Sequence, residues 1–291
     1  MRMGPEADSA ASLSYLFVPG DRPERFRKAY DTSADRVIID LEDAVAPGAT
    51  VSARRNVVAA LSGVDRLDGA GTIAAYVRVN GADTKAFADD IEALRAIAIE
   101  PRNGLRGIVL AKAECPAAVS RVREAFAAEI AVVPLIESAL GLIHALEIAQ
   151  SVAQTEGIDR LAFGAVDFSL DIGAEPLDEN LDYARSQLVI ASRVANLAGP
   201  LESPSLEIDD TDAVERAARR AKGRGFGGML AIHPAQLPAI KAGFAPSAGE
   251  VDWAKAILKV EGGAGRVDGR LVDRPLFERA RRILKDARVW K

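Results

Sequence analysis

The chain has 291 residues, of which 49% are hydrophobic and 27% are charged, and its net charge is −5. This composition is typical of a globular protein that buries a substantial core as one large domain or two small ones. The acidic balance and the lack of a dense basic block argue against a nucleic-acid-binding surface. No apolar run reaches the roughly 18 residues of a membrane span, so we expect no membrane partner.

Two features bear on the compartment. Residues 1–12 are small and polar and lack the apolar centre of a signal peptide, so we expect a disordered tail there. Cys115 is the single cysteine, which excludes an intramolecular disulfide and fits a reducing compartment. We therefore expect a cytoplasmic protein.

Short apolar segments alternate with amphipathic ones along most of the chain. The predicted strands cover residues 14–19, 36–41, 74–80, 107–112, 131–136, 160–165, 200–204 and 229–233. The predicted helices cover residues 22–30, 52–61, 85–97, 116–128, 139–150, 181–197 and 211–223. This alternation implies a parallel sheet, and eight strands over about 230 residues suit a closed α/β barrel of the TIM type, (β/α)8. A doubly wound open sheet is the alternative, but no Gly-x-Gly-x-x-Gly segment follows the first strand.

The pattern changes after His233 and Pro234. The segments there favour a helix at 251–260, a glycine-rich joint at 261–265, a hairpin at 266–273 and a second helix at 275–287. We predict a barrel over residues 13–245 and a C-terminal helical and hairpin extension over 246–291. The joint would allow this extension to cover a barrel mouth, either its own or that of a neighbouring subunit.

Acidic residues follow several of the predicted strands, at the end of a barrel where active sites form. Asp40, Glu42 and Asp43 close one apolar strand, and Glu137 and Asp167 close two later ones. Charges resist desolvation, so acids at the tips of apolar strands indicate a site. Because Glu137 and Asp167 close adjacent strands, we predict that they hold Mg²⁺ with water and substrate oxygens, although each could instead cap the helix that follows. The other three acids are expected to support that site.

Two cations lie among these acids. Arg78 is placed within an apolar strand, where a guanidinium is costly unless it meets a carboxylate of the protein or of a substrate. Lys112 closes the fourth predicted strand and could form a Schiff base with a carbonyl substrate. The density of acids favours an ion pair for Lys112 instead.

A basic segment follows the first predicted strand. Residues 22–28 carry four cations in seven positions, including Arg22, Arg25 and Lys28, directly after Pro19 and Gly20. Such a segment could bind the phosphates of a carrier such as coenzyme A. The alternative is that these cations simply form a solvent-exposed helix face, which is the more common case for such a run.

Six motifs resemble, in the same order, those of one family. They are 16–24 (LFVPGDRPE), 40–45 (DLEDAV), 78–80 (RVN), 137–142 (ESALGL), 163–167 (FGAVD) and 231–236 (AIHPAQ). From about residue 13 onward the chain resembles citrate lyase beta subunits and the related malyl-CoA and citramalyl-CoA lyases of the HpcH/HpaI aldolase superfamily. The resemblance implies a TIM-type barrel, assembled as homotrimers or hexamers, that uses Mg²⁺ to cleave or form a carbon–carbon bond.

The resemblance also implies substrates and roles. The substrates would be 3-hydroxyacyl thioesters, which are split into an acyl thioester and a 2-oxo acid. The predicted catalytic residues are Asp273, Arg78 and Asp40; the predicted substrate-binding residues are Arg78, Arg22, Arg25, Lys28, Glu42, Asp43 and Lys112; the predicted metal ligands are Glu137 and Asp167. Asp273 resembles the aspartate that coenzyme-A-using members present to a neighbouring subunit. Met229 and the segment 202–207 depart from the family pattern, which suggests an atypical acyl group.

The predicted function is that of an Mg²⁺-dependent lyase acting on a coenzyme A thioester. Four alternatives stay open: a citrate lyase beta subunit acting on citryl-acyl-carrier protein, a malyl-CoA thioesterase, a Schiff-base aldolase using Lys112, and a non-enzymatic 2-oxo acid sensor. The tail that carries Asp273 favours the first function, because shorter citrate-lyase-like members lack it.

Overall fold

The computed structural model describes residues 12–62, 73–100, 102–126, 130–152, 160–260, 266–267 and 270–289. The predicted tail lies outside these ranges except for Ser12, and the predicted glycine-rich joint at 261–265 lies outside them entirely. The chain divides into two compact units, residues 1–243 and 244–291. None of the described helices is long and apolar enough to cross a membrane.

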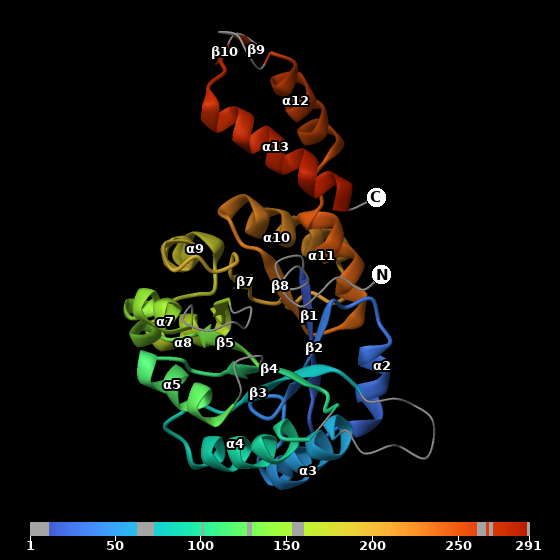
Figure 1. Cartoon of the computed structure of the whole chain (residues 1–291), viewed down its shortest axis with the longest axis vertical. Helices are drawn as coiled ribbons and strands as arrows, with labels where there is room; N and C mark the ends of the chain where they lie inside the picture. The colour runs from blue at the N-terminus through green and yellow to red at the C-terminus, as the bar shows by residue number, and fades with distance from the viewer. Residues whose placement is uncertain are drawn as a thin grey trace. The chain divides into compact units, whose positions relative to one another are not determined.

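The first unit is a closed barrel of eight parallel strands in sequence order, sealed by pairing of the first strand with the last (Figure 1). The strands are β1 (Ser14–Pro19), β2 (Arg36–Asp40), β3 (Ala75–Val79), β4 (Leu105–Leu110), β5 (Ala131–Ile136), β6 (Ala162–Phe163), β7 (Leu201–Glu202) and β8 (Gly228–Ala231). Closure confirms the predicted TIM-type barrel and excludes the open sheet. The seventh strand is the short one expected between Pro200 and Pro204, since proline cannot donate to a ladder.

Helices follow the strands around the outside of the barrel (Figure 1). They are α2 (Phe26–Tyr30), α3 (Thr50–Leu61), α4 (Lys85–Ala98), α5 (Pro116–Ala125), α6 (Ala139–Ile143), α7 (Ala145–Val152), α8 (Ala165–Ile172), α9 (Asp178–Val194), α10 (Thr211–Arg224) and α11 (Leu237–Phe244), with short 3-10 turns at η1 (Pro23–Arg25), η2 (Pro47–Ala49) and η3 (Pro234–Gln236). Each strand is buried because the helices cover the outer face of the sheet and side chains fill the inside.

Aromatic and branched side chains fill the barrel interior. Tyr15 and Tyr76 meet edge to face, with ring centroids 5.7 Å apart, and pack with apolar residues of the other strands. Gly107 leaves room for this packing, since a Cβ there would lie 2.3 Å from the Tyr76 ring. At the opposite end from the strand tips, the buried Arg160 donates to the carbonyl of Ser12 over 3.0 Å. The interior is therefore a filled core, which leaves the carboxyl ends of the strands as the place for a site.

Three local predictions were wrong. The fourth strand ends at Leu110 rather than Lys112, because Lys112 takes a left-handed backbone conformation with φ 49°. The sixth strand is two residues long, since the chain turns at Gly164 into α8, a helix that periodicity did not indicate. The predicted helix at 139–150 is interrupted at His144, whose Nδ1 lies 2.7 Å from the Glu114 carbonyl oxygen.

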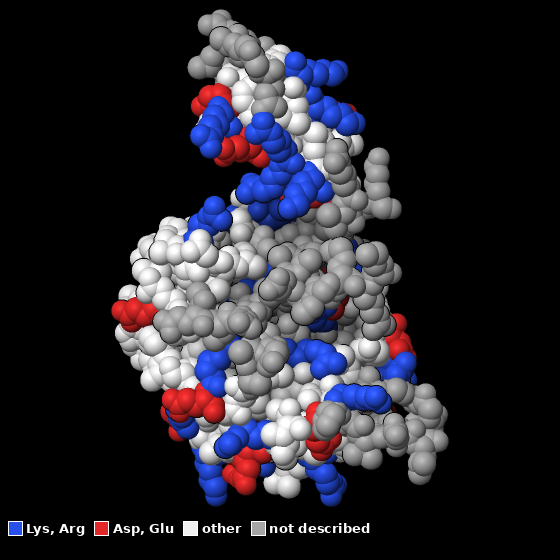
Figure 2. All heavy atoms as spheres, in the orientation of Figure 1, with Lys and Arg blue, Asp and Glu red and all other residues white. Residues whose placement is uncertain are grey.

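The second unit pairs two helices, α12 (Ala248–Lys259) and α13 (Arg274–Val289), joined by a short antiparallel hairpin of β9 (Arg266–Val267) and β10 (Arg270–Leu271). This confirms the predicted hairpin and both predicted helices. Ala254 and Ile257 pack against Ala280 and Ile283 in a small apolar core. Basic side chains are numerous on the face of this unit that Figure 2 shows. On α13, the side chains of Arg281, Arg282 and Lys285 are exposed.

Candidate active site

Asp40 and Arg78 form a bidentate ion pair at the tips of β2 and β3. They are register partners, and Arg78 Nε and Nη2 donate to the two Asp40 carboxylate oxygens over 2.7 and 2.6 Å. The backbone N–H groups of Glu42 and Ala44 donate to the same two oxygens over 3.0 and 2.9 Å. The fully buried Asp40 therefore fixes the plane of the guanidinium, a geometry that lysine could not reproduce.

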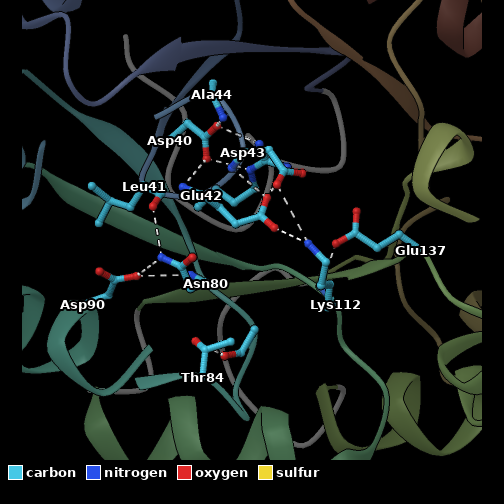
Figure 3. Close-up of polar contacts among 12 residues, drawn as sticks. Asp40, Leu41, Glu42, Asp43, Ala44, Asn80, Thr84, Asp90, Lys112 and Glu137 are labelled. Carbon is cyan, nitrogen blue, oxygen red and sulfur yellow. Dashed lines mark hydrogen bonds and ion pairs between the residues drawn. The ribbon is translucent and has the colours of Figure 1, made fainter. Parts of the chain in front are cut away.

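Glu42 links this pair to the second cation, Lys112; Figure 3 shows its contact with Lys112. One of its carboxylate oxygens lies 3.0 Å from Arg78 Nη1, and the other accepts a hydrogen bond from Lys112 Nζ. Asp43 is exposed, and its carboxylate lies 4.0 Å from Lys112 Nζ. The expected ion pair of Lys112 is confirmed. The three acids Asp40, Glu42 and Asp43 thus meet Arg78 or Lys112 in one continuous cluster.

The cluster favours the charged form of both cations. Burial lowers the pKa of Arg78, but the hydrogen bonds and charge of Asp40, with Glu42 and Glu137, raise it above its ordinary value. Burial also lowers the pKa of Lys112, and the hydrogen bond and charge of Glu42 outweigh it, so the pKa is raised overall. A protonated lysine is a poor nucleophile, which argues against the Schiff-base alternative.

Glu137 lies at the tip of β5 and is only 3% exposed. One of its carboxylate oxygens accepts from the backbone N–H of Lys112 over 2.7 Å. The other oxygen lies against Gly164, where an added Cβ would approach it to 2.5 Å. Burial raises the pKa of Glu137 to about 8, and the negative charges of Glu42 and Asp167 add to this rise. Glu137 is therefore a buried carboxylate close to further acids.

Asp167 is placed in the first turn of α8, three residues after the Gly164 turn that touches Glu137. Among the described residues no three His, Cys, Asp or Glu side chains converge as a complete metal-binding set. Two carboxylates nevertheless fit Mg²⁺, which is usually bound through one or two protein carboxylates and retains several waters. A divalent cation would also stabilise the ionised form of the buried Glu137. The assignment of Glu137 and Asp167 as ligands stays a prediction.

A family model described as HpcH/HpaI aldolase/citrate lyase matches residues 13–234. The chain belongs to this family. A citrate lyase subunit beta-like protein of Mycobacterium tuberculosis is 34% identical over 289 residues, covering 96% of each chain. An L-malyl-CoA/beta-methylmalyl-CoA lyase of Cereibacter sphaeroides is 30% identical, covering 99% of this chain and 98% of the relative. The family resemblance expected from the motifs is confirmed.

A solved family structure is similar over nearly the whole chain. It is the protein CitE of Mycobacterium tuberculosis in complex with magnesium, acetoacetate and coenzyme A, with a TM-score of 0.79 and 31% sequence identity. The similarity covers 96% of this chain and 98% of that one. The structural similarity to CitE therefore includes residues of both compact units of this chain.

The basic segment near β1 lies apart from the acidic cluster. Arg22 directly precedes η1, Arg25 ends it and Lys28 lies in α2, and all three side chains are exposed; no hydrogen bond or ion pair described for them reaches Asp40, Glu42 or Glu137. Arg22 and Arg25 contact only loosely the acids beside them in sequence, at 3.9 and 4.0 Å. Their guanidinium groups face solvent at the end of the barrel where β1 terminates.

Asp273 directly precedes α13 in the second unit of this family member. Its side chain is exposed, and its carbonyl oxygen accepts from the backbone N–H groups of Leu276 and Phe277 over 3.1 and 3.2 Å. The carboxylate is thus held at the start of a helix and open to solvent.

A supporting network behind the cluster was missed by sequence reasoning. Asn80 donates its side-chain amide to the Leu41 carbonyl over 3.0 Å and to Asp90 over 2.7 Å. Arg54 of α3 donates to the other Asp90 oxygen over 2.7 Å. These bonds tie the loop that carries Glu42 to two helices. The available signal was Asp90 itself, an acid on the buried face of α4.

Proposed function

We propose that this protein is an Mg²⁺-dependent carbon–carbon lyase that cleaves or forms a 3-hydroxyacyl-CoA thioester, giving an acyl-CoA and a 2-oxo acid. The observation that carries the proposal is Arg78, held in one plane by Asp40 beside the Glu137 and Asp167 carboxylates. Relatives named as malyl-CoA and citramalyl-CoA lyases support the same reaction class.

Arg78 would bind the carboxylate of the 2-oxo acid. A guanidinium has five N–H donors, and the contacts to Asp40 and Glu42 use three of them. In the part of the chain that the structure describes, the other two donors, one on each terminal nitrogen, have no protein partner, so they remain for a substrate. Because Asp40 already fixes the plane, little ordering of the side chain is needed on binding.

The reaction breaks the bond between C2 and C3 of the acyl chain. The C3 hydroxyl loses its proton and becomes the carbonyl of the 2-oxo acid, while the bonding electrons pass to the thioester as an enolate that takes a proton at C2. When bound, Mg²⁺ supplies Lewis-acid stabilisation of the oxygens of the 2-oxo acid. Glu137 and Asp167 would hold it, and Arg78 and Lys112 would keep the site close to neutral.

Asp273 would be the group that moves a proton at C2. It is a solvent-exposed carboxylate, and the C-terminal unit would bring it to a barrel mouth, its own or that of a neighbouring subunit. Arg22, Arg25 and Lys28 would bind the phosphates of coenzyme A, since they are exposed cations at the active end of the barrel.

The chain would act as a homotrimer or hexamer in the cytoplasm. Large apolar side chains are exposed on three helices: Leu140 and Ile143 on α6, Val166 and Leu170 on α8, and Tyr183, Ile190 and Val194 on α9. Apolar patches of this kind mark protein interfaces. The free Cys115 fits a reducing compartment.

A panel of malyl-, citramalyl- and citryl-CoA, assayed with Mg²⁺ for 2-oxo acid release, tests the proposal. Release of a 2-oxo acid together with a shorter acyl-CoA is expected from at least one of them. Free coenzyme A with an intact hydroxy acid would indicate a thioesterase instead. Turnover of citryl-acyl-carrier protein alone would indicate a citrate lyase subunit. Covalent trapping by borohydride with a 2-oxo acid would indicate a Schiff base on Lys112.

A further inference from the structure

Ser203 follows β7 and lies where regular pairing between β6 and β7 has stopped. The two strands share a single register pair, Ala162 with Leu201. Beyond it, the backbone N–H of Ser203 donates to its neighbour Glu202 over 2.9 Å rather than to β6. The next link between the strands is made by the Ser203 side chain.

The buried hydroxyl of Ser203 bridges the turn that leads into α8. It donates to the Phe163 carbonyl over 2.7 Å and accepts from the Ala165 N–H over 2.7 Å. The residue between these two, Gly164, donates its N–H to the Ile136 carbonyl of β5 over 3.0 Å. Three consecutive residues of the turn are therefore held from two sides.

Ser203 is itself held by a buried ion pair. The second carboxylate oxygen of Glu202 accepts from Arg185 Nε of α9 over 2.7 Å, and both side chains are under 10% exposed. This pair fixes the Glu202 carboxylate, which in turn fixes the Ser203 backbone. The hydroxyl is thus presented to the turn from a rigid support.

The turn connects the two carboxylates predicted to bind the metal. Gly164 packs directly on Glu137, and the N–H of Phe168 donates to the Gly164 carbonyl over 3.0 Å in the helical turn that contains Asp167. We infer that Ser203 is a positioning residue that sets the place of Asp167 relative to Glu137 by clamping this turn. The inference depends on the Mg²⁺ site of the proposed function.

Removal of the hydroxyl would leave the Phe163 carbonyl and the Ala165 N–H without their buried partner, so the turn would have to move. Residues that support metal ligands in this way typically change metal affinity by about 10- to 100-fold when they are replaced. We expect the Ser203→Ala variant to bind Mn²⁺, the probe for Mg²⁺, that much more weakly in an electron paramagnetic resonance titration.

Ser169→Ala is the matched control. Ser169 is an equally buried serine of α8, and its hydroxyl also bonds backbone at this turn, donating to the Ala165 carbonyl over 2.7 Å. The Ala165 carbonyl can still accept a hydrogen bond from a backbone N–H of α8, as helical carbonyls do. The control therefore removes a buried hydroxyl without releasing the turn. Wild-type Mn²⁺ affinity is expected in this variant. Equal Mn²⁺ affinity of the Ser203→Ala and Ser169→Ala proteins would overturn the inference.

Two further outcomes separate the inference from the proposed function. Wild-type protein that binds no Mn²⁺ would overturn the metal site and the role of Ser203 together. Wild-type binding that is lost in Glu137→Ala but unchanged in Ser203→Ala would overturn the role of Ser203 alone. If the alanine variant does not fold, Ser203→Cys fills the same space with a much weaker hydrogen-bonding group, and unchanged affinity in that protein would refute the role equally.

Discussion

Lys112 donates its backbone N–H to the buried Glu137 carboxylate over 2.7 Å from a left-handed backbone conformation, φ 49°. At the same residue, the side chain bonds Glu42. A single position thus orders two acids of the site, one through the backbone and one through the side chain. The left-handed conformation of this non-glycine residue is costly, and it occurs where the chain has just left β4.

Replacing Lys112 separates these two contributions. Glycine adopts the left-handed conformation without a steric cost, whereas alanine, like lysine, has a Cβ and pays for it. The Lys112→Gly protein should therefore be more stable than the Lys112→Ala protein, with a free energy of unfolding about 1 kcal/mol higher. Both variants lose the bond to Glu42, and we expect both to lose most lyase activity. Urea unfolding of the two proteins measures the difference. Equal stability would show that φ at this position relaxes without cost.

Loss of the Asp40 carboxylate should destabilise the fold as well as the site. Asp40→Ala leaves a buried guanidinium without its main partner, so the free energy of unfolding should fall by about 3–5 kcal/mol. The control is Asp31→Ala, which breaks the exposed pair of Asp31 with Arg27 and should cost about 0–1 kcal/mol. Chemical denaturation compares the two variants. A loss of similar size in both would contradict the structural role of the Asp40 pair.

Metal removal should stop carbon–carbon cleavage. Chelation by EDTA is expected to abolish 2-oxo acid release, and added Mg²⁺ is expected to restore it. Glu137→Ala and Asp167→Ala should lose activity that Mg²⁺ does not restore, because each variant lacks one of the two protein ligands proposed to hold the ion. A spectrophotometric assay of the 2-oxo acid follows each case. Undiminished release in the presence of chelator would refute the metal-dependent mechanism.

Asp273 should affect turnover more than binding. Asp273→Asn removes a proton-transferring group while keeping its size, so kcat should fall by about 10²- to 10⁴-fold. The dissociation constant of the thioester, measured by calorimetry, should stay close to that of the wild type. Asp252→Asn, an exposed acid on α12 of the same unit, serves as the control and should leave kcat unchanged. Unaltered kcat in Asp273→Asn would remove this residue from the mechanism.

Local elements were predictable where a single periodicity governs them. Strand β5 is buried throughout and matches the predicted residues, as does β1. Helix α8 was missed because its sequence, AVDFSLDI, continues the apolar run of β6. The change from strand to helix is imposed at Gly164 by contacts with β5 and with Ser203, and those contacts join residues far apart in the chain. A short stretch of sequence around Gly164 therefore carries no information about these contacts.

The sequence by itself determined that a barrel forms and that acids and two cations collect at one end of it. Alternating apolar segments dictate the sheet, and parallel strands bring their carboxyl ends to one edge. Only the tertiary structure decided which charges pair. Asp40 meets Arg78 because β2 and β3 align in that register, whereas Glu42 lies two residues beyond the strand and contacts both Arg78 and Lys112. Lateral register between strands is a property of the closed sheet, and three neighbouring acids therefore acquire three different environments.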